Sequence, residues 1–342
     1  MTGMQDVERF RELLSQVEKV VLITHLNPDG DALGSTTAMG LFLAQMGKDV
    51  QMIIPNAFPG FLSFLSEANR MINAEKEGEK AVKVLNESDL VICLDFNTLK
   101  RVGRFEEPLR NAAQRKVLVD HHPEPDEGFE LYFHRTSASS ASEIVFDLMA
   151  ALNPDLKSLT KEIATALYVG IMTDTGSFNY GANDPDLYAK VGALVRAGAN
   201  PEKLHTKVYS TNSESRIRLL GHSLFNRMVV LKKYKTAYIY LMQKDLKRFH
   251  YHVGDTEGLV NYTLSIKGIN FGVLFTERVG HVKVSLRSKG NFSVNDFARK
   301  HFPTGGGHRN AAGAESRMEL MDTMQMFEEL LPLYIDELNE DC

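Results

Sequence analysis

The sequence has only two cysteines, Cys93 and Cys342, in 342 residues. One lies within an apolar run and the other at the last position, so they provide neither a disulfide framework nor the spacing of a zinc site. Long apolar runs are also missing, since no stretch approaches the roughly 20 residues needed to span a bilayer. The N-terminal residues, MTGMQDVERFRELLSQ, lack the apolar core of a signal peptide. These absences predict a cytoplasmic protein with no membrane partner.

The sequence also lacks an excess of positive charge. Its formal net charge is -5 at pH 7, which argues against binding of long duplex nucleic acid through a general basic surface. A short anionic substrate, held by a local positive site, is compatible with this charge. The length of 342 residues exceeds the size at which one hydrophobic core usually keeps growing, so two domains are expected.

Short, nearly all-apolar segments alternate with helical segments in the first half of the chain. Runs that are apolar on both faces are typical of parallel strands covered by helices on both sides. This half is therefore predicted to be α/β, a doubly wound domain with a mainly parallel sheet. The expected strands are 19–24, 49–54, 89–95 and 116–120, and the expected helices are 32–47, 140–152, 161–175 and 185–197.

A polar stretch, NPEKLHTKVYSTNSES, marks the expected boundary between domains. It divides the chain into a first domain of residues 1–198, a linker of residues 199–215 and a second domain of residues 216–342. Alternating segments predict a smaller α/β domain with a mixed or antiparallel sheet in this second part. Its expected elements are strands at 236–242, 270–278 and 281–288, and a closing acidic amphipathic helix at 318–342.

Histidine and aspartate side chains follow three of the predicted parallel strands, and one more aspartate ends an apolar helix. The carboxyl ends of parallel strands share one edge of the sheet, where open α/β folds bind ligands. Taken singly, each aspartate is also a common turn or cap residue. Taken together, four segments would bring carboxylates and imidazoles to one place: His25, Asp29 and Asp31 in ITHLNPDGDALG, Asp95 in LVICLD, Asp120, His121 and His122 after KVLV, and Asp174 in GIMTDTG.

Such a combination of side chains is typical of a site for divalent cations. Several aspartates with two or three histidines and no cysteine suit Mn²⁺ or Mg²⁺ better than a structural zinc. Six carboxylate or imidazole groups exceed the protein ligands of one open catalytic site, so two ions are expected. Two ions about 3.5–4 Å apart, bridged by a carboxylate, activate a hydroxide and polarise a phosphoryl oxygen. The pattern therefore predicts hydrolysis of phosphoesters.

Five motifs carry a resemblance to a known family. HLNPDGD, VICLD, VDHHP and GIMTDTG, in this order, resemble the four motifs of the DHH phosphoesterase superfamily, and GGGHRNAAG resembles the signature of the DHHA1 domain. Together they span nearly the whole chain. Within the superfamily, the length and the GGGH signature are similar to the stand-alone NrnA-like type.

This resemblance implies a DHH metal-binding catalytic domain and a DHHA1 substrate-binding domain with an active-site cleft between them. The implied activity is hydrolysis of short single-stranded RNA, removal of the 3′-phosphate from 3′-phosphoadenosine 5′-phosphate, or both. Two alternatives are a phosphodiesterase of cyclic or linear dinucleotides and a non-catalytic nucleotide-binding regulator. A homodimer is left open.

The resemblance also implies a role for each residue of the cluster. His122 would face the scissile phosphate, and Asp120 would either orient the histidine pair or bind a metal directly. Mn²⁺ is the preferred ion, with Mg²⁺ and Co²⁺ as alternatives. The other histidines, His134 among them, lack a metal-like grouping and are expected to be surface or core residues. One ion would be held by His25, Asp29 and Asp95, and the other by Asp31, Asp95, His121 and Asp174.

A local basic cluster lies in the second domain. Six Lys or Arg residues occur between Gly280 and Asn310, against the single acid Asp296. Three consecutive glycines let backbone N–H groups approach an anion, although they also suit a tight turn. An arginine on a strand can bind phosphate through two parallel hydrogen bonds. The predicted substrate-binding residues are Arg287, Gly305, Gly306, Gly307 and His308, with the resemblance favouring Arg287 and His308.

Overall fold

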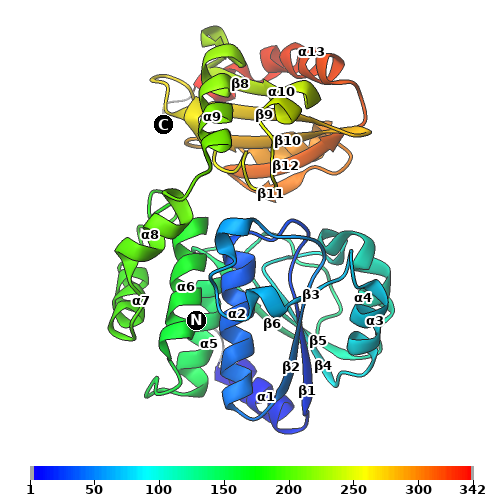
Figure 1. Ribbon diagram of the computed structural model, residues 1–342, viewed down its shortest axis with the longest axis vertical. Coiled ribbons are helices and arrows are strands. Elements are labelled where there is room, and N and C mark those ends of the chain that lie inside the picture. Colours follow the sequence, from blue (N-terminus) through cyan, green and yellow to red (C-terminus); the bar gives the residue numbers. More distant parts are fainter. Residues whose placement is uncertain (1–3, 340–342) are drawn as a thin grey trace. The chain divides into compact units, whose positions relative to one another are not determined.

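The computed structural model describes residues 4–339, which form two compact units with the division between Thr211 and Asn212 (Figure 1). The stretch predicted as a linker, 199–215, is largely helical. It contains α8 (Pro201–Tyr209), which Asn200 caps by accepting the N–H of Lys203 at 3.0 Å. Proline at the first helical position suits this start, because its missing N–H would have no helical partner there. Among the described residues, no helix is both long and apolar enough to cross a membrane.

The first unit contains a six-stranded sheet in which all strands are parallel. The strand order is β3-β2-β1-β4-β5-β6, so successive strands are added on one side of β1 and then, from β4 onward, on the other. The predicted doubly wound α/β fold is confirmed. The strands are β1 (Lys19–Ile23), β2 (Asp49–Ile54), β3 (Ile72–Asn73), β4 (Leu90–Leu94), β5 (Arg115–Asp120) and β6 (Leu131–His134).

Helices cover both faces of this sheet (Figure 1). Successive residues of a strand point to opposite faces, so Leu22 belongs to one apolar cluster while Ile23 and Cys93 belong to the other. The burial predicted for Cys93 is thus confirmed. The first face is covered by α1 (Met4–Ser15), α2 (Gly30–Gln45), α5 (Ala141–Leu152) and α6 (Lys161–Asp174), with α7 (Pro185–Arg196) packed on α6. The second face is covered by α3 (Gly78–Asn86), the 3₁₀ helix η3 (Leu99–Phe105) and α4 (Glu106–Asn111).

The second unit is a smaller α/β fold with a six-stranded mixed sheet, as predicted. The strand order is β11-β12-β10-β9-β8-β7; β8 and β9 are parallel and the other neighbours are antiparallel. Its strands are β7 (Met228–Leu231), β8 (Thr236–Leu241), β9 (Phe271–Arg278), β10 (His281–Ser288), β11 (Gly306–His308) and β12 (Ala311–Ser316). Its helices include α9 (Glu214–Asn226), α10 (Gln243–Arg248), α11 (Asn261–Leu264) and α12 (Val294–His301).

The prediction of one closing helix over 318–342 is wrong. The structure has α13 (Leu320–Leu330), a 3₁₀ turn (Leu331–Tyr334) and α14 (Ile335–Asn339), and residues 340–342 lie outside the described part. Pro332 explains the break, because proline has no N–H for the helical ladder and its ring clashes with the preceding turn. α13 packs on the sheet through Phe327, whose ring lies edge-on to Tyr238 and Phe275.

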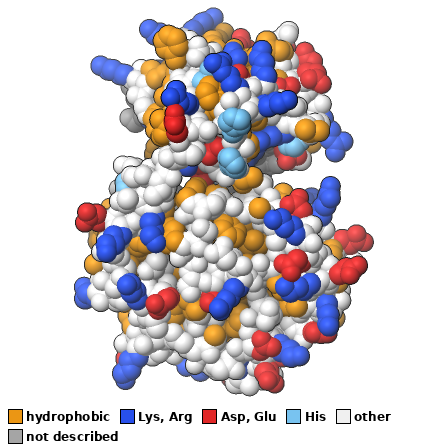
Figure 2. All heavy atoms as spheres, in the orientation of Figure 1, with side chains coloured by type: hydrophobic (Ala, Val, Ile, Leu, Met, Phe, Trp, Pro, Cys, Tyr) orange, Lys and Arg blue, Asp and Glu red, His pale blue; other side chains and the backbone are white. Residues whose placement is uncertain are grey.

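The surface of the molecule carries charges of both signs. On the face shown in Figure 2, Lys and Arg side chains are interspersed with Asp and Glu side chains over the first unit. Such mixing is typical of a globular protein whose charge is close to balanced.

Candidate metal centre

The predicted site residues of the first unit lie at the carboxyl edge of its sheet. β1, β4 and β5 are parallel neighbours, so their carboxyl ends lie side by side. His25 is two residues beyond the end of β1, Asp95 directly follows β4, and Asp120 ends β5. The order of strand addition reverses between β1 and β4, which is where open α/β sheets bind their ligands.

Asp29 and Asp31 have different surroundings although only one residue separates them. Asp29 is the N-cap of α2, because its Oδ1 accepts the N–H groups of Asp31 at 3.0 Å and Ala32 at 3.1 Å. Asp31 lies in the first turn of the same helix and is 1% exposed. Its Oδ2 accepts the N–H of Ala141 at 2.6 Å, and its Oδ1 accepts that of Ser142 at 2.9 Å. The start of α5 therefore holds both carboxylate oxygens of Asp31.

Asp95 lies at the centre of the cluster. Its φ of 63° is in the left-handed region, which residues with a side chain seldom adopt and which recurs at functional sites. Its Oδ2 lies 3.3 Å from Nε2 of His25, and its Oδ1 lies 3.5 Å from Nε2 of His121. Burial alone would raise the pKa of the Asp95 carboxyl, but its contacts with His121 and His25 outweigh burial and hold that pKa below its usual range.

Asp95 belongs to more than one group of potential metal ligands. The donor atoms of His25, Asp29 and Asp95 lie within 4.8 Å of one another, and so do those of Asp31, Asp95 and His121. The sixth predicted ligand, Asp174, ends α6 and places Oδ2 3.4 Å from Nε2 of His121. The structure therefore brings all six predicted metal-binding side chains together, with Asp95 common to both groups.

The negative charges of this cluster act on each other and on His121. Burial raises the pKa of Asp31 well above its usual value, and the carboxylates of Asp95 and Asp174 raise it further. Burial lowers the pKa of His121, but the same two carboxylates and Asp31 together raise it well above its usual value. Nδ1 of His121 lies 3.3 Å from the carbonyl oxygen of Ala138, which leaves Nε2 on the side of the acids. The site is thus electrostatically suited to gain positive charge.

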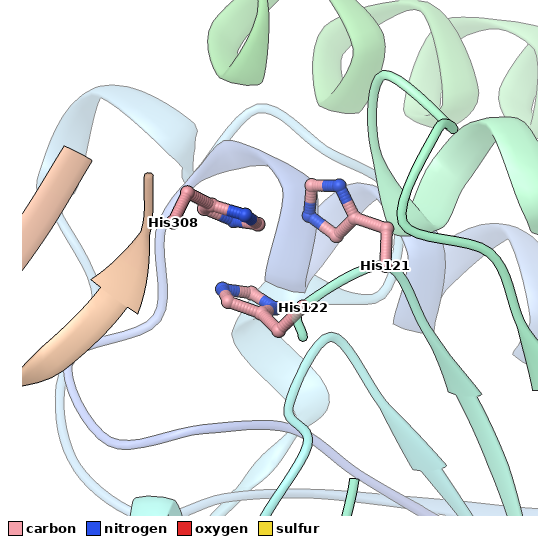
Figure 3. A group of neighbouring side chains, drawn as sticks. All are labelled: His121, His122 and His308. Carbon is pink, nitrogen blue, oxygen red and sulfur yellow. The ribbon is translucent and has the colours of Figure 1, made fainter. Parts of the chain in front are cut away.

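His122 and Asp120 form a closely bonded pair within the cluster, and their donor atoms lie within 4.8 Å of one another and of Asp95. Oδ1 of Asp120 lies 2.8 Å from Nδ1 of His122, and Oδ2 accepts the backbone N–H of His122 at 3.0 Å. Burial raises the pKa of Asp120 to about 6. Figure 3 shows the rings of His121 and His122 on the loop that follows β5; they are steeply inclined, with an interplanar angle of 73° and centroids 4.8 Å apart.

The residues of this edge fit divalent cations. Oδ1 of Asp95 is buried and accepts no hydrogen bond from the described residues, and a buried carboxylate oxygen without such a partner is costly unless a cation or another donor binds it. The donors are carboxylate oxygens and imidazole nitrogens without sulfur, which suits Mn²⁺ or Mg²⁺.

The predicted substrate-binding residues of the second unit lie on β10 and β11, except Gly305, which directly precedes β11. Arg287 is on β10, where its Nη1 donates to the carbonyl oxygen of Leu286 at 3.0 Å, and His308 ends β11. The N–H of Gly305 bonds to the carbonyl oxygen of Phe302, and that of Gly307 bonds to Oδ1 of Asn295.

A cradle of unpaired backbone N–H groups is therefore not formed by Gly305 and Gly307. The two glycines permit close packing instead. A Cβ at Gly305 would lie 2.1 Å from the carbonyl oxygen of Ala298, and one at Gly307, where φ is 150°, would lie 2.4 Å from that of Ala311. Glycine is the residue that tolerates such approaches of one backbone to another.

Four residues near the site were not found by sequence reasoning. His134 was expected to be an ordinary surface or core residue, yet its Nε2 lies 2.5 Å from the carbonyl oxygen of His122. Arg101, on η3, has a buried Nη1 that makes no hydrogen bond within the described chain. Ala138 contributes only a backbone carbonyl, which leaves no signal in the sequence. Glu143 does leave one, since Ser140 and Glu143 have the spacing of a helix capping box.

The fold and the donor set define a doubly wound α/β protein with a histidine- and aspartate-rich candidate cation site. Residues 19–171 match the family described as "DHH family, N-terminal domain", and residues 232–338 match the "DHHA1 domain". The chain belongs to the DHH family, and the resemblance predicted from its five motifs is confirmed.

Individual relatives cover nearly the whole chain. The "Bifunctional oligoribonuclease and PAP phosphatase NrnA" of Bacillus subtilis is 28% identical, over 88% of this chain and 90% of its own. The crystal structure of an exopolyphosphatase-related protein from Bacteroides fragilis is 36% identical, with a TM-score of 0.94 and 99% of both chains covered. RecJ from Thermus thermophilus, crystallised in complex with Mn²⁺, shares the fold at 16% identity and a TM-score of 0.55, covering 98% of this chain and 54% of RecJ.

Proposed function

We propose that this protein is a metal-dependent phosphoesterase that hydrolyses short single-stranded RNA and 3′-phosphoadenosine 5′-phosphate. Membership of the DHH family supports the reaction class, and the name of the Bacillus subtilis relative supports these two substrates. The location in the cytoplasm stays a prediction. A homodimer stays an open alternative.

The observation that carries this proposal is the position of Asp95. It is common to three groups of donor atoms, each within 4.8 Å, two of which match the predicted ion sites, and its buried Oδ1 accepts no hydrogen bond within the described chain. In the proposed centre, His25, Asp29 and Asp95 hold one ion, and Asp31, Asp95, His121 and Asp174 hold the other. We favour Mn²⁺, with Mg²⁺ and Co²⁺ as alternatives. When bound, the ions would supply an activated water and neutralise charge on the phosphoryl group.

Asp120 and His122 are proposed to serve the reaction without holding an ion. Asp120 accepts from Nδ1 of His122 and from its backbone N–H, which fixes the ring, and Nε2 is the ring atom proposed to face a phosphate. A histidine so oriented can donate a hydrogen bond or a proton to a phosphate oxygen.

The second unit is proposed to bind the substrate. Arg287 and His308 would contact its phosphates, and the three glycines would shape the strand that carries His308. This assignment gives residues 1–198 the metal-binding catalytic role and residues 216–342 the substrate-binding role. Binding of a few phosphates by a local basic cluster would suit short single strands rather than long duplexes.

An enzyme is favoured over a regulator that only binds a nucleotide. A regulator has no need of every metal-binding carboxylate, whereas all six predicted ligands are present and lie together here. A phosphodiesterase acting on dinucleotides would use the same centre, so only the choice of substrate separates it from the main proposal.

A product time course tests the proposed function. The purified protein is incubated with Mn²⁺ and end-labelled RNAs of increasing length, and in parallel with 3′-phosphoadenosine 5′-phosphate and with cyclic and linear dinucleotides. We expect rapid release of mononucleotides from the shortest RNAs and of phosphate from the bisphosphate. The Asp95→Asn variant controls for contaminating nucleases. Lack of Mn²⁺-dependent turnover of both proposed substrates would overturn the proposal.

A further inference from the structure

The segment 135–142, which leads from β6 into the first turn of α5, holds two of the proposed metal ligands through its backbone. The carbonyl oxygen of Ala138 lies 3.3 Å from Nδ1 of His121, and the N–H groups of Ala141 and Ser142 bind the two oxygens of Asp31. None of these contacts depends on the side chain of the holding residue. The positions of Asp31 and His121 therefore depend on how firmly this segment is fixed.

One buried carboxylate fixes the segment. Oε2 of Glu143 accepts the N–H of Ser139 at 2.8 Å, and the N–H of Glu143 donates to Oγ of Ser140 at 3.1 Å. Ser139 lies between Ala138, which contacts His121, and Ala141, which contacts Asp31. Glu143 is only 4% exposed, so its carboxylate needs partners with which to share its charge.

Two positively charged side chains, Arg135 and Lys190, and the carboxylate of Asp147 complete these contacts. Oε1 of Glu143 accepts from Nη2 of Arg135 at 2.9 Å and from Nζ of Lys190 at 2.7 Å. The same two nitrogens bind Oδ2 of Asp147, at 2.7 Å and 2.8 Å. Arg135 also donates its backbone N–H to the carbonyl oxygen of Asp120 at 3.1 Å. The network thus joins α5 and α7 to the end of β5, which directly precedes His121.

We infer that Glu143 is a positioning residue for the metal centre, fixing the segment from Arg135 to Ser142 so that Asp31 and His121 face one cation. This inference rests on the proposed function, because it assumes that Asp31 and His121 are ligands. Glu143 does not reach the cation itself, since both of its carboxylate oxygens bind the loop, Arg135 and Lys190.

Asp147 provides a comparison within the same network. Its carboxylate shares Arg135 and Lys190 with Glu143, but Glu143 also accepts the N–H of Ser139, a bond that Asp147 does not make within the described chain. A purely structural network would lose stability on removal of either acid without a change in metal affinity. A positioning role for Glu143 predicts a loss of metal affinity that is larger for Glu143→Gln than for Asp147→Asn.

The test compares three variants of the full-length protein with the wild type. Glu143→Gln removes the charge, Asp147→Asn weakens the same ion pairs, and Glu106→Gln breaks an exposed pair with Arg110 on α4 that does not contact the segment. Each protein is stripped of metal with a chelator and titrated with Mn²⁺ in a calorimeter. Amide hydrogen exchange is measured on the metal-free proteins, and kcat and KM are measured at saturating Mn²⁺.

We expect Glu143→Gln to weaken one Mn²⁺ site by about 10- to 100-fold, the usual effect of losing a partner that orients ligands. Exchange at Ala141 and Ser142 should accelerate, and kcat should fall with KM unchanged. Asp147→Asn should weaken binding less, and Glu106→Gln should match the wild type.

Unchanged Mn²⁺ affinity and unchanged exchange in folded Glu143→Gln would overturn the inference. If that variant does not fold, equal Mn²⁺ affinity of Asp147→Asn and wild type, with no faster exchange at Ala141 and Ser142, would overturn it. If the wild type itself binds no Mn²⁺, the proposed function fails. The exchange at Ala141 and Ser142 then still reports whether Glu143 fixes the segment.

Discussion

Both carboxylate oxygens of Asp120 bind His122: Oδ1 lies 2.8 Å from ring atom Nδ1, and Oδ2 accepts the backbone N–H at 3.0 Å. Such a carboxylate determines which ring nitrogen carries the proton and how the ring is oriented. In Asp120→Asn the side chain keeps its shape, but it can turn an NH₂ group, a donor, toward Nδ1 in place of an accepting oxygen. We expect kcat to fall by about 10- to 100-fold, with bound Mn²⁺ unchanged by elemental analysis. Loss of an ion in this variant would identify Asp120 as a direct ligand.

Replacement of His122 separates chemistry from metal binding. If His122 contacts the scissile phosphate, His122→Ala should lower kcat by on the order of 10²-fold or more, the usual effect of losing a proton donor or a charge-stabilising group. Its Mn²⁺ content should stay close to that of the wild type. Steady-state kinetics and metal analysis on the same preparation test this, and a variant that has lost metal would place His122 among the ligands.

Asp95 is best tested with asparagine, because asparagine tolerates the left-handed backbone found at this position. If Asp95 bridges two ions, Asp95→Asn should lose activity and bind less Mn²⁺. In the wild type, Mn²⁺ added after chelation should raise the unfolding temperature, since it binds only the folded state. Thermal unfolding with and without Mn²⁺ should show a much smaller rise in the variant. Near-normal turnover at saturating Mn²⁺ would contradict the bridging role.

Arg287 is expected to affect binding more than chemistry. Arg287→Ala should raise KM for short RNA by about tenfold or more, because a charge-assisted bond to phosphate is lost in both the ground and the transition state. Hydrolysis of bis-p-nitrophenyl phosphate, which has no second phosphate, should change little. Arg218→Ala is a control, because that arginine lies on α9 outside the basic cluster and pairs with Glu214. An equal loss on both substrates would assign Arg287 to the chemical step.

The stability of the second unit should depend on pH through Asp245. This buried carboxylate accepts from Nε of Arg227 at 2.8 Å and from Nη2 at 2.9 Å. Burial raises the pKa of Asp245, but Arg227 and the N–H of Met242 outweigh burial, so the pKa lies below its ordinary value of 3.8. Its stabilising contribution is therefore present above that value and is lost as the pH falls through the lower folded-state pKa.

Asp245→Asn tests this dependence. At pH 7 the variant should lose about 2 kcal/mol of unfolding free energy, the scale of hydrogen bonds to charged groups. At acid pH the difference from the wild type should shrink, because the wild type then also loses the carboxylate. Urea unfolding followed by circular dichroism at both pH values measures the two differences, and a constant difference would contradict the assignment.

The elements that carry the site were predictable from short stretches of sequence. β1, β4 and β5 are apolar on both faces over most of their length, and this local pattern predicts buried parallel strands. The residues that follow them must then lie at one edge, so the cluster around Asp95 was predictable before the structure. β7 and β11 were missed because four- and three-residue strands carry too few residues for a pattern to be recognised.

Only the tertiary structure decided how these side chains are held. Asp31 and Ala141 are 110 positions apart in sequence, so no local sequence pattern predicts that the start of α5 binds this carboxylate. The contact between His121 and Ala138 uses a backbone carbonyl, which every residue possesses. The glycines of the GGGH signature suited either an anion cradle or a turn, and the pairing of their N–H groups depends on Asn295 and on the β11–β12 ladder. Residue types determined which chemistry is available, because donor atoms belong to side chains, whereas packing between distant segments determined which donors meet and which groups hold them in place.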